Sequence, residues 1–248
     1  MAQLPKLQYY PLPETLHQQT EAYLQARDQE QRLLPDDVVR MLPAVPQGHP
    51  YYEEWRARQA SLKRLISFLS KEQPQGKVLD LGCGNGWMSY ALVQKGFEVC
   101  GLEVNTQEIE QAARVFEHDR LHWIRGNVEE NLPIGPFDAI IISAALQYFP
   151  DPAALMRHLK SYLNHGGGIM VMDTFLYPEA EASDAQARSK AYFSTLGVEA
   201  MTTHYHHHQA TWLAEFKHQF VYRPSLKQKV LRKLGQAVSP FPMVWITP

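Results

Sequence analysis

Short apolar runs alternate with amphipathic stretches along most of the chain after residue 75. Each run is bounded by glycine, proline or polar residues, which is typical of strands buried on both faces of a sheet. The stretches between them place apolar residues at helical intervals. This pattern predicts strands at 78–81, 97–102, 121–125, 137–143, 169–173, 215–223 and 241–247. Strands that alternate with helices indicate an α/β fold with a parallel sheet and right-handed crossovers.

The same periodicity locates the helices. They are expected at 14–34, 51–70, 106–117, 151–164 and 225–234, and another opens at Trp87. The three glycines that follow His165 are expected to end the helix that begins at Asp151.

The N-terminal part of the chain has a different character. Seven prolines break residues 1–50 into short pieces, and the possible helix at 14–34 has only a thin apolar stripe in a glutamine-rich background. We therefore expect residues 1–75 to form a helical arm and residues 76–248 to form the main domain. The arm is either packed on the core or a lid over the site, and residues 174–212 are expected to be an insertion on the substrate side.

Composition narrows the class of protein. The chain has 248 residues and a formal net charge of −2, so no strong charge imbalance requires a nucleic-acid or membrane partner. No apolar run approaches the roughly 18 residues of a membrane-spanning helix. Two cysteines do not make a disulfide framework, which favours a reducing, cytoplasmic location. We expect a monomer or a homodimer.

A glycine-rich turn follows the strand at 78–81. Asp80 is followed by glycines at every second position, Gly82, Gly84 and Gly86. The fingerprint of dinucleotide-binding proteins needs another glycine where this chain has Trp87, and an indole there would obstruct the close approach of helix and strand. Asp80 would also repel a pyrophosphate but attract a cation. The turn therefore disfavours a dehydrogenase of the Rossmann type.

The pattern D-x-G-x-G-x-G closely resembles motif I of the class I S-adenosylmethionine-dependent methyltransferases. The resemblance extends over about residues 76–248 and is nearest to the type 11 and type 25 branch, whose members act on small molecules. It implies S-adenosyl-L-methionine as cofactor and a Rossmann-like, seven-stranded, mostly parallel sheet with an antiparallel last strand. It also implies a set of cofactor-binding residues: Asp80, Gly82, Cys83, Gly84, Gly86, Glu103, Val104, Asn127, Val128 and Ser143.

Two of these residues also carry an argument from their chemistry. Glu103 ends the second predicted strand, where a carboxylate can accept hydrogen bonds from both ribose hydroxyls; the alternative is a solvated glutamate. Asn127 stands where the family usually has an acidic residue that takes the adenine amino group. Its amide oxygen can still accept that bond, with Val128 against the ring, although an ordinary Gly-Asn turn remains open.

The residues that would face the methyl acceptor are less determined. Residues 202–208 contain four histidines in five positions, but no cysteine or carboxylate lies close by, so we expect no metal. His204 or Tyr205 is a candidate general base or orienting donor, because histidine titrates near neutral pH. Tyr148 falls where the family lines the methyl-transfer site, and core packing is its alternative. Surface or capping roles for the histidines remain open.

The sequence therefore predicts a methyltransferase that acts on an O, N or C atom of a small molecule. The Asn/Asp-Pro-Pro-Tyr/Phe signature of base and amide N-methyltransferases is absent, and so is an acidic cluster for Mg²⁺. A protein or RNA methyltransferase is less favoured, because neither a basic groove nor an acidic tail-binding surface is evident. A non-catalytic cofactor-binding or scaffold protein would keep the glycine turn, and this alternative stays open.

Overall fold

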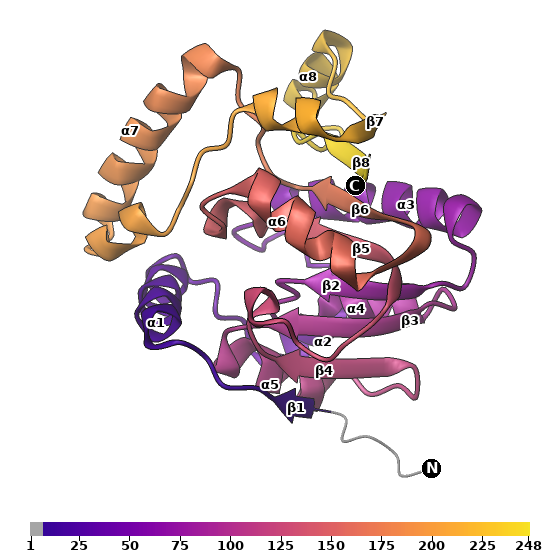
Figure 1. Cartoon of the computed structure of the whole chain (residues 1–248). Coiled ribbons are helices and arrows are strands. Elements are labelled where there is room, and N and C mark those ends of the chain that lie inside the picture. The colour runs from indigo at the N-terminus through magenta and orange to yellow at the C-terminus, as the bar shows by residue number, and fades with distance from the viewer. Residues whose placement is uncertain (1–6) are drawn as a thin grey trace.

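Eight strands form one sheet at the centre of the computed structural model, which describes residues 7–248 (Figure 1). The order across the sheet is β1-β4-β3-β2-β5-β6-β8-β7. The strands are β1 Leu7–Tyr9, β2 Lys77–Leu81, β3 Glu98–Glu103, β4 Leu121–Arg125, β5 Phe137–Ser143, β6 Leu163–Met172, β7 Lys217–Tyr222 and β8 Met243–Thr247. All neighbours are parallel except β8, which is antiparallel to both β6 and β7. The α/β class, the seven predicted strands and the antiparallel last strand are confirmed.

The eighth strand was not predicted from the sequence. β1 lies in the N-terminal arm and pairs with β4, with Leu7 opposite Trp123. It is only three residues long and stands among prolines. So short a segment carries no periodicity of its own, and it becomes a strand because β4 offers it an open edge.

Helices cover both faces of the sheet. The helices of the described chain, not all of which lie on a face, are α1 Glu14–Gln29, α2 Asp36–Met41, α3 Tyr52–Glu72, α4 Trp87–Val93, α5 Thr106–Val115, α6 Pro152–Leu159, α7 Glu179–Thr195 and α8 Leu226–Lys233. Side chains of α3, α4 and α5 pack on one face with residues such as Val78 and Ile141. Side chains of α6 pack on the other face with residues such as Leu79 and Ile140. This alternation is why consecutive residues of these strands are all buried.

Two predicted helix ends are wrong. The helix expected at 151–164 ends at Leu159, and the glycine run belongs to β6 rather than to a helix end. A Cβ added at Gly168 would lie 2.4 Å from Cζ2 of Trp245 on β8. Gly167 and Gly168 are therefore required by the close approach of neighbouring strands, which no local pattern reveals, whereas Gly166 has a φ of 83° and no atom within 4 Å of an added Cβ. The first helix is also shorter than predicted, since α1 ends at Gln29.

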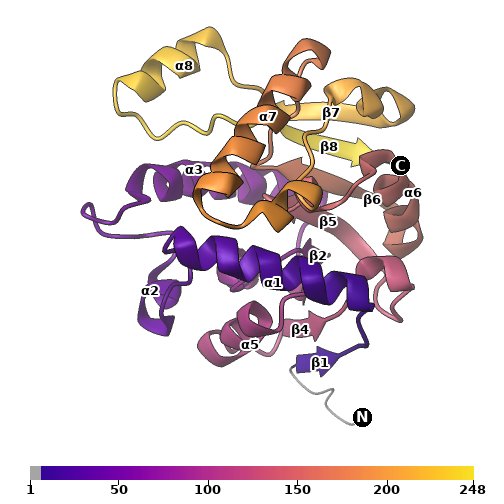
Figure 2. The same ribbon diagram turned by 90° about the vertical axis from the view of Figure 1, so that its left-hand side faces the viewer.

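The arm lies against the edge of the sheet where the parallel strands end (Figure 2). α1 crosses this edge, and α7 stands beside it. A small separate core joins them, made by Ala22, Ala26, Phe193, Val198 and Met201. Residues far apart in the sequence thus enclose the carboxyl ends of β2 and β5, where ligands bind in open parallel sheets.

Candidate functional site

A cavity of about 570 Å³ opens at the carboxyl ends of the strands. This volume suits a small organic ligand. Seven of the predicted site residues line it: Asp80, Gly82, Cys83, Gly84, Ser143, Tyr148 and Tyr205. The other predicted residues, Gly86, Glu103, Val104, Asn127, Val128 and His204, are not among the residues lining this cavity.

The glycine turn forms the floor of the cavity. Gly82 has a φ of 72°, and an added Cβ would lie 2.7 Å from Cβ of Ala145. The backbone N–H groups of Gly82 and Cys83 both donate to the carbonyl of Leu102, which ties the turn to β3. After the turn, the indole of Trp87 packs edge-on against Trp55 of α3 at a centroid distance of 5.5 Å. The turn therefore exposes bare backbone, while Trp87 fills the place of a third glycine.

Asp80 offers an unused acceptor. Its Oδ2 accepts a hydrogen bond of 2.6 Å from the Ser89 hydroxyl, whereas the buried Oδ1 has no partner within residues 7–248. Burial raises the pKa of this carboxyl to about 6. A buried acceptor without a donor is costly unless a ligand supplies one, so Oδ1 fits an ammonium or another donor group.

Glu103 is buried and holds the glycine turn in place. Its Oε2 accepts from the N–H of Gly84 at 3.0 Å, and its Oε1 accepts from the N–H groups of Val104 and Asn105, both at 2.9 Å. Burial, and then the nearby Glu108 carboxyl, raise the pKa of Glu103 to about 7. It is therefore not a solvated residue at the end of a strand, and Oε2 keeps capacity for one more donor.

Asn127 and Val128 lie in a capped turn. The Asn127 side chain accepts from the N–H of Glu129 at 3.2 Å, and the Val128 carbonyl lies 2.8 Å from Nε2 of His158. Both residues are buried. Their contact with adenine stays a prediction.

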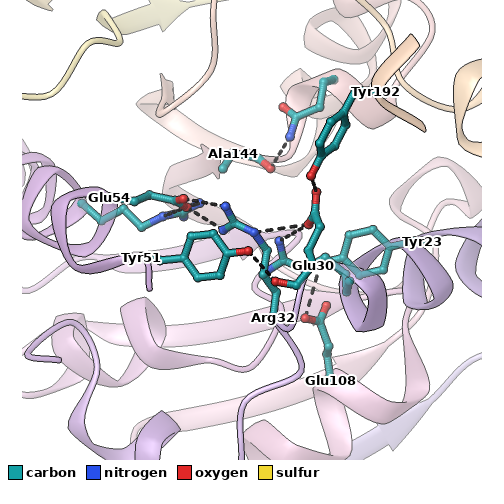
Figure 3. Close-up of polar contacts among 11 residues, drawn as sticks. Tyr23, Glu30, Arg32, Tyr51, Glu54, Glu108, Ala144 and Tyr192 are labelled. Atoms are coloured by element: carbon teal, nitrogen blue, oxygen red, sulfur yellow. Dashed lines mark hydrogen bonds and ion pairs between the residues drawn. The ribbon is translucent and has the colours of Figure 1, made fainter. Parts of the chain in front are cut away.

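Among the cavity residues that were not predicted from the sequence are Tyr23, Arg27 and Glu108; Figure 3 shows Tyr23 and Glu108. The Tyr23 hydroxyl of α1 donates to Oε1 of Glu108 on α5 at 3.4 Å. The buried Nε of Arg27 has no hydrogen-bond partner in the described chain, and its Nη1 lies 3.7 Å from Glu30. No sequence signal links 23 and 27 to 108, because only the docking of α1 brings them together. A half-buried guanidinium whose buried Nε is an unused donor suits an anionic group of a ligand.

A polar network holds the arm over the cavity (Figure 3). Arg32 donates to both carboxylate oxygens of Glu54 on α3, at 2.9 and 2.7 Å. The hydroxyl of Tyr192 on α7 donates to Glu30 at 2.7 Å, and the hydroxyl of Tyr51 donates to the Glu30 carbonyl. The network thus joins α1, α3 and α7, and it lines the cavity. Whether the arm acts as a lid or is only packed on the core stays a prediction.

Aromatic side chains and two histidines form a further wall of the cavity. Tyr148 packs edge-on against both Tyr23 and Tyr205, at centroid distances of 5.5 and 5.8 Å. His207 Nε2 lies 2.9 Å from the Ser189 hydroxyl of α7, while its buried Nδ1 has no partner among the residues described. Burial lowers the pKa of His206 and His207 and raises that of Tyr205 to about 12. At neutral pH this wall offers a neutral imidazole and a protonated phenol.

Residues 7–248 contain no group of three histidine, cysteine, aspartate or glutamate side chains placed to hold a metal ion. Within the same range, no helix has the length and apolar character needed to cross a membrane.

Known proteins and a protein family resemble this chain in sequence. A family model described as a methyltransferase domain matches residues 52–223, which is more than half of the chain. The ubiquinone biosynthesis O-methyltransferase of Xylella fastidiosa is 30% identical over 119 residues. That match covers 43% of this chain and 46% of the relative, so the chain spans less than half the length of the curated relatives it matches.

Solved structures share the fold. Magnesium protoporphyrin IX methyltransferase from Synechocystis PCC 6803, solved with bound S-adenosylhomocysteine, has a TM-score of 0.60 and 12% identity. That similarity covers 95% of this chain and all of the other chain. An S-adenosylmethionine-dependent methyltransferase from Mesorhizobium loti has a TM-score of 0.57 and 21% identity, over 77% of this chain and 98% of the other. At such identities the likeness shows the fold alone.

Proposed function

The chain belongs to the class I S-adenosylmethionine-dependent methyltransferases, and we propose that it transfers the methyl group of its cofactor to an O, N or C atom of a small molecule. One observation carries the proposal. A single cavity joins the glycine turn and Asp80 on one side to Tyr148, Tyr205 and His207 on the other. Donor and acceptor can therefore meet in one cavity, and their alignment there is the main requirement of an in-line methyl transfer.

The unused polar atoms in and beside the cavity match a zwitterionic nucleoside. When bound, S-adenosylmethionine supplies a methyl group that its sulfonium already activates. Asp80 Oδ1 would accept from the ammonium, and Arg27 would donate to the carboxylate. Glu103 would accept from the ribose through the free capacity of Oε2. We keep Asn127 and Val128 as the proposed contacts of adenine, and Cys83, Val104 and Ser143 as neighbours of the cofactor.

An oxygen acceptor is the favoured version of this proposal. The curated relatives are named as O-methyltransferases, although this chain matches less than half of the length of each relative. The wall of Tyr148, Tyr205 and His207 would stack an aromatic acceptor, and a neutral imidazole can take the proton from a hydroxyl group.

Binding experiments test the function directly. Calorimetric titration with S-adenosylmethionine and S-adenosylhomocysteine is expected to give micromolar dissociation constants, with none for NADH. A screen of phenols, amines and carboxylic acids with methyl-labelled cofactor then identifies the acceptor. Binding of the cofactor without transfer to any acceptor would favour the non-catalytic alternative, and failure of both titrations would refute the proposal.

Replacing Arg27 with glutamine is expected to raise the Kd of S-adenosylmethionine by about tenfold or more, because a charge-assisted hydrogen bond to its carboxylate is lost. The Kd of methylthioadenosine, which lacks the amino-acid end, should stay within about twofold. Calorimetry with the two ligands checks both values. An equal weakening for both would mean that Arg27 only supports the shape of the site.

A second prediction concerns the side chains that would face the methyl acceptor. Substituting Tyr205 with phenylalanine or His207 with glutamine should lower kcat by about tenfold or more if the acceptor is a hydroxyl, with the cofactor Kd unchanged. His204→Gln should have a smaller effect, since His204 does not line the cavity. The methyl-transfer rates of the three variants show which of these side chains takes part in the reaction. If only His204→Gln loses activity, the original prediction for His204 stands and the role given to His207 is wrong.

A further inference from the structure

The C-terminal segment of the chain is positively charged, although the whole chain has a formal net charge of −2. From Phe216 to Pro248 there are six lysine and arginine residues and no aspartate or glutamate. The rest of the chain then holds 18 of the 24 basic residues and all 26 acidic residues, a net charge of −8 against +6. So uneven a distribution favours a local, negatively charged partner rather than a general effect on solubility.

The helix within this segment exposes an apolar stripe. Leu226, Val230 and Leu234 recur at four-residue intervals along α8 and its C-terminal end, which places them on one side of the helix. Their exposures are 80%, 56% and 73%, so the fold leaves this stripe open to solvent. Leu226 and Leu234 are the most exposed large hydrophobic residues in the described chain. α8 stands at the periphery, at the opposite end of the sheet from β1 (Figures 1 and 2).

The end of α8 also reaches the mouth of the cavity. Arg232 and Gln236 are among the cavity-lining residues, together with Phe175 and Phe241. The two phenylalanine rings meet edge-on at a centroid distance of 4.6 Å, and Phe175 is 47% exposed. Arg232 and the exposed stripe lie on different sides of α8, so one side of this helix lines the cavity while another is open to solvent.

We propose that α8 lies on an anionic lipid surface, with Leu226, Val230 and Leu234 inserted among the lipids, and that the acceptor enters the cavity from that surface. A short amphipathic helix in a basic segment can bind in this way, through burial of its apolar side and attraction to anionic head groups. The expectation of no membrane partner rested on mean charge and on the lack of a spanning segment, and neither criterion detects a helix that lies on a surface. The acceptor would then be an apolar or amphipathic molecule dissolved in lipid.

The docking part of this proposal stands without the proposed activity, whereas the acceptor class rests on it. Vesicle binding and cofactor binding are therefore measured separately on the full chain. The vesicles are phosphatidylcholine alone, or phosphatidylcholine and phosphatidylglycerol in equal parts. The test variant carries Leu226→Gln, Val230→Gln and Leu234→Gln. The control is Met41→Gln, since Met41 of α2 is 48% exposed but lies in a different part of the sequence and in a different helix.

In a sedimentation assay, wild type and the Met41→Gln control should bind the anionic vesicles equally. The triple variant should lose about tenfold or more in partitioning, because three inserted aliphatic side chains are removed. Phosphatidylcholine alone should bind weakly, and raising the salt from about 0.1 M to about 0.5 M should weaken binding to the anionic vesicles. Circular dichroism and the Kd of S-adenosylmethionine should not differ among the proteins.

Two results would overturn the docking proposal. One is equal vesicle binding by wild type and the triple variant. The other is the absence of vesicle binding by wild type, together with binding of a single-stranded RNA oligonucleotide, which would assign the basic segment to nucleic acid. Loss of cofactor binding with vesicle binding intact would instead refute the proposed function and leave α8 as a lipid-binding helix.

Discussion

Substituting Glu103 with alanine is expected to raise the Kd of S-adenosylmethionine by about 100-fold or more. Two effects combine. Hydrogen bonds from ribose to a carboxylate are lost, each contributing about 1.5–3 kcal/mol. The N–H of Gly84 also loses its acceptor, so the turn against which the cofactor lies is no longer held. Calorimetric titration of the purified variant measures the change.

Glu98→Ala is the matched control. Glu98 lies at the start of the same strand, where its partly exposed carboxylate pairs with Lys77 at 3.5 Å. Its loss should change the Kd by no more than about twofold, because an exposed pair contributes little. The variant Glu108→Gln tests the alternative that the ribose contacts Glu108, because Glu108 lines the cavity and Glu103 does not. An unchanged Kd in Glu103→Ala with a large loss in Glu108→Gln would move the ribose contact to Glu108.

The same residue predicts a pH dependence of cofactor binding. With the pKa of Glu103 near 7, the carboxylate is mostly ionised at about pH 8 and mostly protonated at about pH 6. Ribose hydroxyls donate to the ionised form, so the affinity should fall by up to about tenfold as the pH falls across this window. Glu103→Gln should remove this dependence. Any dependence that it retains reports the other buried carboxyls of the cavity: Asp80, whose pKa burial raises to about 6, and Glu108, whose pKa burial also raises.

Gly86→Ala is expected to lower the free energy of unfolding by about 3 kcal/mol. Gly86 caps α4 with a φ of 79°, a conformation that costs an L-residue about 1–2 kcal/mol. An added Cβ would lie 2.4 Å from Cη2 of the buried Trp123 and 2.8 Å from Cβ of Ala112. Overpacking of this kind adds about 1–3 kcal/mol, because neither neighbour has free space to move into.

Gly96→Ala separates the two contributions to this loss. Gly96 also has a positive φ, of 96°, but no atom lies within 4 Å of its added Cβ. Its substitution should cost only the conformational part, about 1–2 kcal/mol. Urea denaturation of both variants without cofactor gives the comparison. Equal losses would mean that Trp123 yields easily and that packing does not explain the glycine.

The strands and the glycine turn were predictable because their signals are local. Each central strand is a continuous apolar run, and burial on both faces of a parallel sheet requires that composition whatever the neighbouring strand is. The turn from Asp80 to Gly86 is likewise contiguous, and its backbone geometry needs glycine at fixed positions. Glu103 was found because it ends the next strand, although its bonds to Gly84, Val104 and Asn105 were not foreseen.

The acceptor side could not be predicted with the same precision. His204, His206 and His207 are near neighbours in a segment with no regular helix, so spacing cannot tell which ring faces the cavity. His206 and His207 line the cavity, and the position of His207 depends on Ser189 of α7. The exposed stripe on α8 was equally hidden, because Leu226, Val230 and Leu234 would read as a buried face in any helix that has a partner.

The sequence by itself determined the fold class, the succession of strands along the chain after residue 75, the glycine turn and the protein family, which implies the cofactor. These depend on residues close together in the chain and on backbone rules that hold in any context. Only the tertiary structure decided that β1 extends the sheet, that Tyr23 and Arg27 reach Glu108, and that Glu30, Arg32, Glu54 and Tyr192 close the arm over the cavity. Those contacts join segments as much as 162 residues apart. They arise from how amphipathic elements dock, and no local pattern specifies the partner of a docked face.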